Sequence, residues 1–122
     1  QLEAKMLLNM ESDIFDDLKA LKKLQNLGPK EVIITLGADG YKGISRDGEI
    51  FSKPGIKVAV LSTHGAGDSF VGTLAAFICK GEHISVAAQY AQASSALHIK
   101  TPIDQREKIK QVDIENMFLL NQ

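Results

Sequence analysis

The sequence predicts an α/β domain with three layers, α/β/α, built around a largely parallel sheet. Residues 12–27 carry apolar side chains at spacings of three and four, which is typical of one face of a helix. The β-branched run EVIITL over residues 31–36 follows, with the pattern of a strand covered on both sides. A helix that leads directly into a buried strand favours a parallel α/β layer.

Two further elements are expected between this strand and residue 65. Asp47-Gly48 lies between short alternating segments, so the sequence predicts a hairpin over residues 41–53, placed at an edge of the sheet. The run KVAVL predicts another strand over residues 57–61.

Helical patterns dominate the second half of the sequence. The expected helices cover residues 66–80, 85–99 and 105–118. Gly81 is a stop signal for the first of them, and Pro102 prevents the second from continuing. Because the second helix is rich in alanine, we expect it to pack closely against its neighbours.

The composition of the chain indicates which kinds of binding partner to expect. With 14 basic and 15 acidic residues the net charge is −1, so the charge signature of a nucleic-acid or membrane binder is missing and a small molecule is the better default. No apolar run reaches transmembrane length and no signal core is present, so a cytoplasmic location is expected. The single cysteine, Cys79, is expected to be buried in packing.

The length of 122 residues suits one domain. The first residue is Gln1 rather than methionine, so residues 1–122 are interpreted as a single domain or as a fragment of something longer.

The stretch LSTHGAGDSF carries the main functional hypothesis. Gly65, Ala66 and Gly67 lie between a predicted strand and a predicted helix, where unpaired helix N–H groups create an anion site and glycines allow close approach. The acidic residue Asp68 follows at once. The spacing matches neither the Gly-x-Gly-x-x-Gly dinucleotide motif nor a P-loop.

Two interpretations of Asp68 remain open from the residues alone. In the simpler one it is a charge at a helix start, worth about 0.3–1 kcal/mol. In the other it takes a proton from an attacking hydroxyl, while the N–H groups stabilise charge on a transferred phosphoryl group. A carboxylate beside a site that only held phosphate would be unfavourable, because like charges repel. That repulsion favours the second interpretation.

The segment STHGAGDSFVGTLAAF resembles the C-terminal signature of the ribokinase-like (PfkB) family of carbohydrate and nucleoside kinases. A second family motif, VIITLGADG over Val32 to Gly40, lies upstream in register. The resemblance covers roughly Asn9 to Ile103, which corresponds to the C-terminal part of a family member. It implies ATP as phosphoryl donor, with Mg²⁺ held largely by phosphates and water, so no protein metal ligand is assigned.

The resemblance also implies roles for individual residues. Asp68 matches the catalytic base, and Gly65, Ala66 and Gly67, together with the Asp68 backbone, match the anion hole. The nucleotide site matches Thr35, Gly37, Gly40 and Gln92. Each of these nucleotide-site residues has a plainer interpretation as a strand, turn or helix-packing residue, and His83 and His98 are interpreted as surface residues.

Departures from the family pattern bear on substrate and cation. Many members have Asp where this chain has Ser62, and that acid takes part in a monovalent-cation site, so dependence on a monovalent cation is doubtful. Ser62 instead resembles the branch that acts on phosphorylated ketohexoses, while a free sugar or a nucleoside stays open as acceptor. The Asn-x-x-Glu motif is matched only at Asn9, since Ser12 takes the fourth position.

Family members bind the sugar largely through an N-terminal region and a small β-sheet lid, which are not recognisable here. The chain by itself is therefore expected to be weak or inactive, and a homodimer would form through that region. The alternative is a non-catalytic nucleotide-binding or interaction domain derived from the same fold. Retention of Asp68 favours the enzyme.

Overall fold

The computed structural model describes residues 4–7 and 31–121. The chain forms two compact units that divide between Gly55 and Ile56, and each is described by itself. The predicted helix over residues 12–27 and the partial motif at Asn9 lie outside the described residues.

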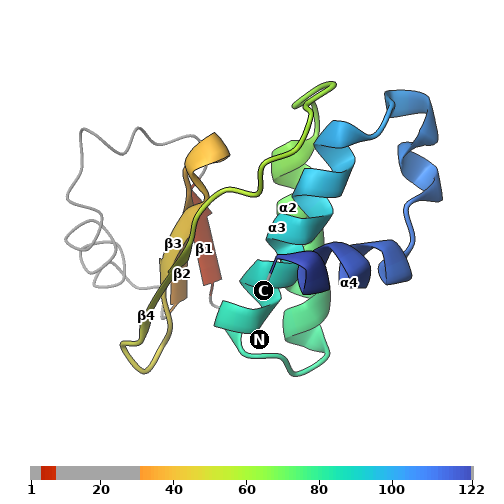
Figure 1. Ribbon diagram of the computed structural model, residues 1–122. Coiled ribbons are helices and arrows are strands. Elements are labelled where there is room, and N and C mark those ends of the chain that lie inside the picture. Colours follow the sequence, from red (N-terminus) through yellow and green to blue (C-terminus); the bar gives the residue numbers. More distant parts are fainter. Residues whose placement is uncertain (1–3, 8–30, 122) are drawn as a thin grey trace. The chain divides into compact units, whose positions relative to one another are not determined.

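The first unit contains a four-stranded sheet in the order β1-β2-β3-β4 (Figure 1). The strands are β1 (Ala4–Leu7), β2 (Glu31–Thr35), β3 (Tyr41–Ile44) and β4 (Ile50–Lys53). Strand β1 pairs with β2 in parallel, whereas β2 with β3 and β3 with β4 are antiparallel. The prediction of a largely parallel sheet is therefore wrong for the described residues. Short turns connect β2, β3 and β4, and such turns join antiparallel neighbours.

Alternation along the strands creates the core of this unit. Val32 and Ile34 are buried on one face of β2 and pack with Ile44, which lies opposite Val32 in the register. On β3, Gly43 lies opposite Phe51, and a Cβ on Gly43 would collide with that ring. The aromatic ring thus fills the place of the missing side chain.

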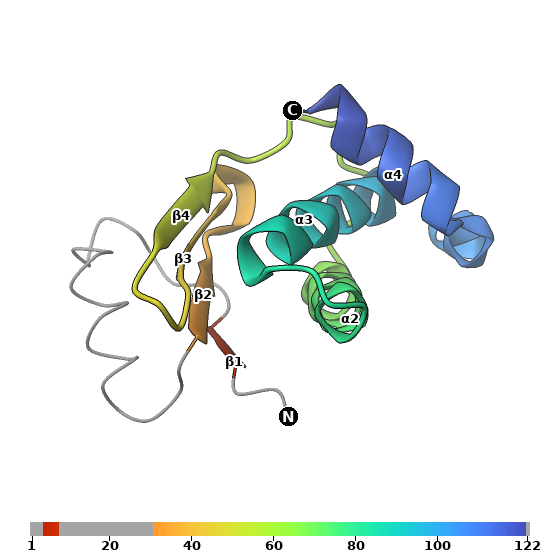
Figure 2. The ribbon, with the colours of Figure 1, turned by 90° about the horizontal axis from the view of Figure 1, so that it is seen from below.

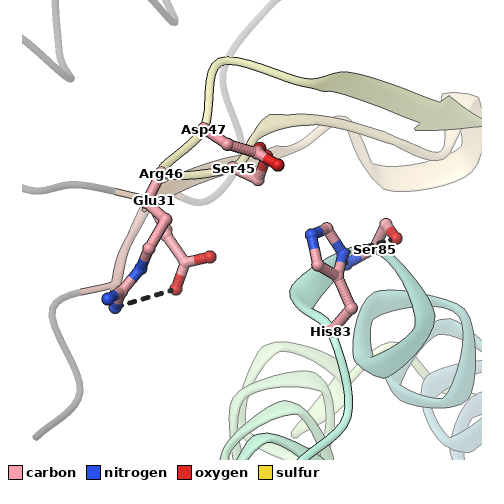
Figure 3. Close-up of polar contacts among 6 residues, drawn as sticks. All are labelled: Glu31, Ser45, Arg46, Asp47, His83 and Ser85. Carbon is pink, nitrogen blue, oxygen red and sulfur yellow. Dashed lines mark hydrogen bonds and ion pairs between the residues drawn. The ribbon is translucent and has the colours of Figure 1, made fainter.

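The hairpin predicted over residues 41–53 is confirmed, with β4 at the sheet edge. Its turn is closed by the Ser45 N–H, which donates to the Glu49 carbonyl at 2.9 Å, and Gly48 takes a left-handed φ of 88°. Beside the turn, the Asp47 carboxylate accepts a hydrogen bond from the Ser45 hydroxyl (Figure 3). Arg46 and Glu31 form an ion pair at 3.9 Å, which at this exposure adds little stability.

The second unit is helical, and its first two helices agree with the predicted ranges to within one residue at each end. Helix α2 covers Ala66–Cys79 and α3 covers Ile84–Lys100. Gly81 ends the first as predicted, with φ 95° and an N–H that donates to the Ile78 carbonyl at 2.9 Å. Pro102 follows the end of the second.

Helices α2 and α3 pack side by side, as both ribbon views show (Figure 2). Helix α2 contributes buried Phe70, Leu74 and Phe77, a helical spacing of four and three. The alanine-rich α3 was expected to pack closely, and this is confirmed: its buried small residues are Ala87, Ala88, Ala91, Ala93, Ser94 and Ala96. Side chains this small allow the two helix backbones to approach.

The predicted strand over residues 57–61 is wrong, because residues 54–60 form no strand. Val60 and Leu61 are 53% and 61% exposed. At the end of the segment, the N–H groups of Leu61 and Ser62 donate to the Ile99 carbonyl of α3, at 2.8 and 3.3 Å. Branched side chains favour extended backbone, but a strand also requires a partner strand. Here the end of a helix provides the hydrogen-bond acceptor.

The single helix predicted over residues 105–118 is also wrong in part. The chain forms a 3₁₀ helix, η2 (Ile103–Lys108), and then α4 (Gln111–Leu120). The Lys110 N–H donates to the Asp113 carboxylate at 2.8 Å, so Asp113 caps a new helix start instead of continuing an old one. Tyr90 of α3 stacks between Phe77 and Phe118, with ring centroids 4.1 Å apart on both sides.

Candidate functional site

The first glycine turn, residues 36–40, follows β2 and, together with Thr35 at the end of that strand, holds three of the four residues predicted to lie near a nucleotide. Thr35 ends β2 and is half-buried, whereas Gly37 is exposed and begins a 3₁₀ turn, η1 (Gly37–Asp39), with φ 57°. Gly40 is buried; its N–H donates to the Gly37 carbonyl at 3.2 Å, and its carbonyl accepts from Leu36 at 2.8 Å. The structure thus brings these residues together in one turn.

Within that turn, Gly40 and Gly37 face different surroundings. A Cβ on Gly40 would lie 2.6 Å from the carbonyl carbon of Pro54 and closer still to the Lys53 carbonyl oxygen. A Cβ on Gly37 would meet nothing within 4 Å. Gly40 therefore shapes the turn by allowing two backbone segments to touch, while Gly37 presents open backbone to the surface.

The second glycine turn, residues 61–65, leads into α2. Gly65 is the N-cap residue and takes a left-handed conformation, φ 79° and ψ 3°. A side chain there would be strained, and its Cβ would lie 3.2 Å from Nε2 of His98. Because Gly65 has no side-chain acceptor, it cannot cap the amides that open the helix.

These amides are the predicted anion site. The first bond of the helical ladder, at 3.0 Å, ends at the Gly65 carbonyl, and the amides before it take no part in the ladder. The described residues supply no acceptor for the amides of Gly65, Gly67 and Asp68. The Ala66 N–H differs, since it donates to the Thr63 carbonyl at 3.1 Å. Three of the four predicted donors are thus available, and one is engaged within the turn.

Asp68 lies in the first turn of α2, and its side chain is exposed. The amide dipoles of a helix give its N-terminal end a partial positive charge, which attracts anions. The arrangement therefore combines an exposed carboxylate with open N–H groups from the same turn.

Gln92 is half-buried on α3. Three residues further along α3, Ser95 donates to the Ala66 carbonyl at 3.3 Å, and the neighbouring Ser94 hydroxyl lies 2.9 Å from that of Ser69. Residues three apart lie on the same side of a helix. Gln92 therefore shares the side of α3 that contacts the start of α2.

His98 was interpreted as a surface residue, and the structure corrects this. Its ring is half-buried beside the Gly65 turn. Burial, followed by the positive charges of Arg106 and His64, lowers the pKa of His98 below its ordinary value of 6.5. His83, by contrast, is exposed as expected and caps α3, where its Nδ1 accepts from the Ser85 N–H at 3.2 Å (Figure 3).

Sequence reasoning missed Arg106, which donates hydrogen bonds to the Ser62 and His64 carbonyls of the second turn. These partners are 44 and 42 residues away in the sequence. Because the acceptors are backbone atoms, no residue type marks them, and no sequence signal could have identified the pair.

Within residues 4–7 and 31–121, no helix is both long and apolar enough to cross a membrane. No group of three or more His, Cys, Asp or Glu residues there could hold a metal ion. Cys79, expected to be buried, is exposed at the end of α2, because it lies on the side of the helix away from Phe70, Leu74 and Phe77.

Comparison with known proteins extends these observations. The family model for pfkB family carbohydrate kinases matches residues 1–109. The 5-dehydro-2-deoxygluconokinase of Bacillus velezensis is 38% identical over 66 residues, which cover 54% of this chain and 20% of that protein. The 1-phosphofructokinase of Escherichia coli K12 is 37% identical over 84 residues, covering 69% and 27% respectively.

A solved structure from E. coli, assigned as ribokinase II and in complex with ATP and Mg²⁺, superposes with a TM-score of 0.82 at 25% identity. The match covers 97% of this chain and 39% of the other. The chain thus spans well under half the length of the relatives that it matches, and the likeness supports a ribokinase-like fold.

Proposed function

Since the chain belongs to the pfkB family of carbohydrate kinases, we propose that it is the nucleotide-side part of an ATP-dependent kinase that phosphorylates a hydroxyl group. The acceptor class is a sugar, a sugar phosphate or a nucleoside. The names of the two relatives, a gluconokinase and a phosphofructokinase, support sugar or phosphosugar acceptors. Ser62, which resembles the branch of the family that acts on phosphorylated ketohexoses, favours a phosphorylated sugar as the acceptor.

Asp68 is the proposed general base. Its exposed carboxylate can accept the proton of the acceptor hydroxyl as the new oxygen–phosphorus bond forms and the bond from that phosphorus to the leaving ADP breaks. A carboxylate at this position would weaken simple phosphate holding through charge repulsion, so its presence favours catalysis over binding alone. The juxtaposition of this exposed acid with open amides is the observation that carries the proposal.

The Gly67 and Asp68 amides are the proposed donors to the transferred phosphoryl group. Preorganised N–H groups stabilise charge that develops in the transition state without any reorganisation at the moment of reaction. We narrow the predicted anion hole accordingly, because the Ala66 N–H already donates within the turn. Gly65 remains necessary for the backbone conformation that opens the helix there.

The start of α2 fits a nucleotide tail, because its open N–H groups are donors to which phosphate oxygens bind. In the other unit, taken by itself, the Gly37 turn presents exposed backbone. When bound, ATP would supply the phosphoryl group and Mg²⁺ would offset phosphate charge. The resemblance assigns Thr35, Gly37 and Gln92 to the nucleotide. Gly40 is assigned a supporting role, because its own N–H and carbonyl bond within the turn.

This chain alone is proposed to be weak or inactive, because positioning of the acceptor supplies much of the rate in phosphoryl transfer. Its matches cover only 20% and 27% of the two kinases described above. Activity therefore belongs to the full-length protein that contains this chain. The exposed Cys79 thiol is compatible with a reducing compartment, and we propose the cytoplasm.

The decisive experiment is Asp68→Asn in the full-length protein, assayed with ATP and Mg²⁺ against a panel of sugars, sugar phosphates and nucleosides. We expect kcat for the best acceptor to fall by about 10²–10⁴, while ATP affinity, measured by calorimetry, stays nearly unchanged. Glu82→Gln is the matched control, because it removes an exposed acid just beyond the other end of α2.

The same pair of measurements separates the kinase from a non-catalytic nucleotide-binding domain. In a binding domain, neither the wild type nor Asp68→Asn would phosphorylate any acceptor on the panel, although both would bind ATP. Turnover that is unaffected by Asp68→Asn would contradict the role of base.

A further inference from the structure

Arg106 reaches across the second unit to the turn that precedes the proposed anion site. Its Nη1 donates to the His64 carbonyl at 2.6 Å and its Nη2 to the Ser62 carbonyl at 2.9 Å. Its Nε donates to the Thr101 carbonyl at 3.2 Å. One guanidinium thus connects the 61–65 turn to the segment that follows α3. Such a planar fork of donors holds its partners in a defined geometry.

These bonds determine the orientation of a peptide plane that matters for the site. In a trans peptide, the carbonyl of one residue and the N–H of the next point in opposite directions. Because the His64 carbonyl points to Arg106, the Gly65 N–H must point away from it. The Gly65 carbonyl then begins the helical ladder, at 3.0 Å. The direction in which the first N–H groups of α2 point therefore depends on the orientation of the His64–Gly65 peptide.

Two other residues, Ile99 and His98, also contact the 61–65 turn. The Ile99 carbonyl accepts from Leu61 and Ser62, and the His64 N–H donates to the Ser62 hydroxyl at 3.2 Å. The His98 ring lies against Gly65. None of these contacts involves the His64 carbonyl. Among the described residues, Arg106 is therefore the one hydrogen-bond donor to that carbonyl.

The three acceptors are neutral, and the donor carries a permanent positive charge. Backbone carbonyl oxygens arranged around a positive charge are also the ligands that potassium uses in proteins. At this position the carbonyls of Ser62 and His64 are bonded to a side chain, so a dissolved cation would have to displace it.

We propose that Arg106 is a positioning residue that orients the His64–Gly65 peptide. Its guanidinium also supplies the positive charge that the Ser62 and His64 carbonyls of the turn contact. The turn consequently does not require a dissolved monovalent cation. The inference rests on the proposed function only where turnover is the measurement; the conformation of the turn can be tested independently.

The test compares Arg106→Ala, Arg106→Lys and the control Lys108→Ala in the full-length protein. Lys108 is exposed on the same 3₁₀ helix, so its variant removes the same charge from the same segment. We expect kcat of Arg106→Ala to fall about 10²-fold, the usual effect of misplacing donors by about 1 Å, with a smaller change in KM for ATP. Arg106→Lys keeps the charge but loses the fork, so its kcat should lie in between.

Chemical rescue distinguishes positioning from a general loss of structure. Guanidinium chloride at millimolar concentration should restore part of the kcat of Arg106→Ala and leave the wild type and Lys108→Ala unchanged. Potassium chloride should not raise wild-type kcat. A several-fold activation of the wild type by potassium, or an Arg106→Ala variant with wild-type kcat and KM, would overturn the proposal.

Hydrogen exchange at the amides of Ala66 and Ser69, which donate to the Thr63 and Gly65 carbonyls, provides the measurement that does not depend on activity. Arg106→Ala should accelerate exchange there, while Lys108→Ala should not. If the wild type phosphorylates no acceptor but Arg106→Ala still accelerates exchange, the proposed function fails and the positioning role stands. If the wild type is active and exchange in Arg106→Ala is unchanged, the positioning role fails.

Discussion

The turn at residues 36–40 and the turn at residues 61–65 both place a left-handed glycine beside a regular element, yet they are held by different kinds of contact. In the first, the Leu36 and Gly40 amides bond to carbonyls within the same five residues. In the second, the partners are Ile99 and Arg106, which lie more than 30 residues further along the chain. The first turn is a local structure, whereas the second exists only once three helical segments have assembled.

Because the two turns are held by different contacts, they should respond differently to amino-acid substitutions. A local turn is sensitive to the shape of its own residues, because its bonds form whenever those residues take the right backbone angles. A turn held from a distance is also sensitive to the residues that hold it. Two glycine substitutions and one pH dependence test this contrast, in decreasing order of their effect on stability.

Gly40→Ala should cause the largest loss of stability, about 3–5 kcal/mol. The added Cβ would overlap the Lys53 carbonyl oxygen, and φ 95° is unfavourable for any side chain. The free energy of unfolding, from chemical denaturation of the full-length protein, measures the effect. Gly37→Ala is the matched control, because its Cβ meets nothing within 4 Å and only the left-handed backbone costs about 1–2 kcal/mol. Equal losses in the two variants would show that the close approach at Gly40 relaxes freely.

Gly65→Ala should be less destabilising, at about 1–2 kcal/mol for the left-handed backbone, with a further contribution from its contact with His98. A double-mutant cycle with His98→Ala isolates that contact, and we expect a coupling of about 0.5 kcal/mol or more. Gly48→Ala, with φ 88° and an open Cβ position, calibrates the backbone contribution alone. A coupling of zero would mean that His98 does not brace the turn.

The smallest effect should be a pH dependence that involves His98. Its pKa is lowered in the folded state, so the unfolded state binds more protons below pH 6.5 and the contribution to stability is lost as pH falls. The melting temperature of the wild type should therefore decline on acidification more steeply than that of His98→Gln. An NMR titration of the ring checks the cause directly. A midpoint at or above 6.5 would contradict the assignment, and Arg106→Ala should raise the midpoint by removing a nearby positive charge.

The parts that sequence patterns predicted well are those with short-range causes. The buried run at Val32 to Ile34, the Asp47-Gly48 hairpin and the helix stop at Gly81 each follow from residues within a few positions of one another. The two failures have different causes. Residues 57–61 have strand composition but no partner strand among the described residues, which is a long-range effect. The break before α4 is local, because Asp113 caps the Lys110 amide three residues away.

The candidate site divides in the same way. Gly65 and Asp68 were found from the motif, because a glycine turn and an acid at a helix start are visible in the residues themselves. The burial of His98 and the contacts of Arg106 were not visible, because each depends on a partner that the fold brings close.

Residue patterns alone were enough to predict helices α2 and α3, the hairpin over residues 41–53 and an acid beside the start of α2, since backbone preferences act between near neighbours. Tertiary structure decided which amides at that helix start remain open and which side chains hold them in place. Hydrogen bonds to backbone carbonyls carry no signature in residue type, so only the folded chain reveals that one guanidinium orients the turn.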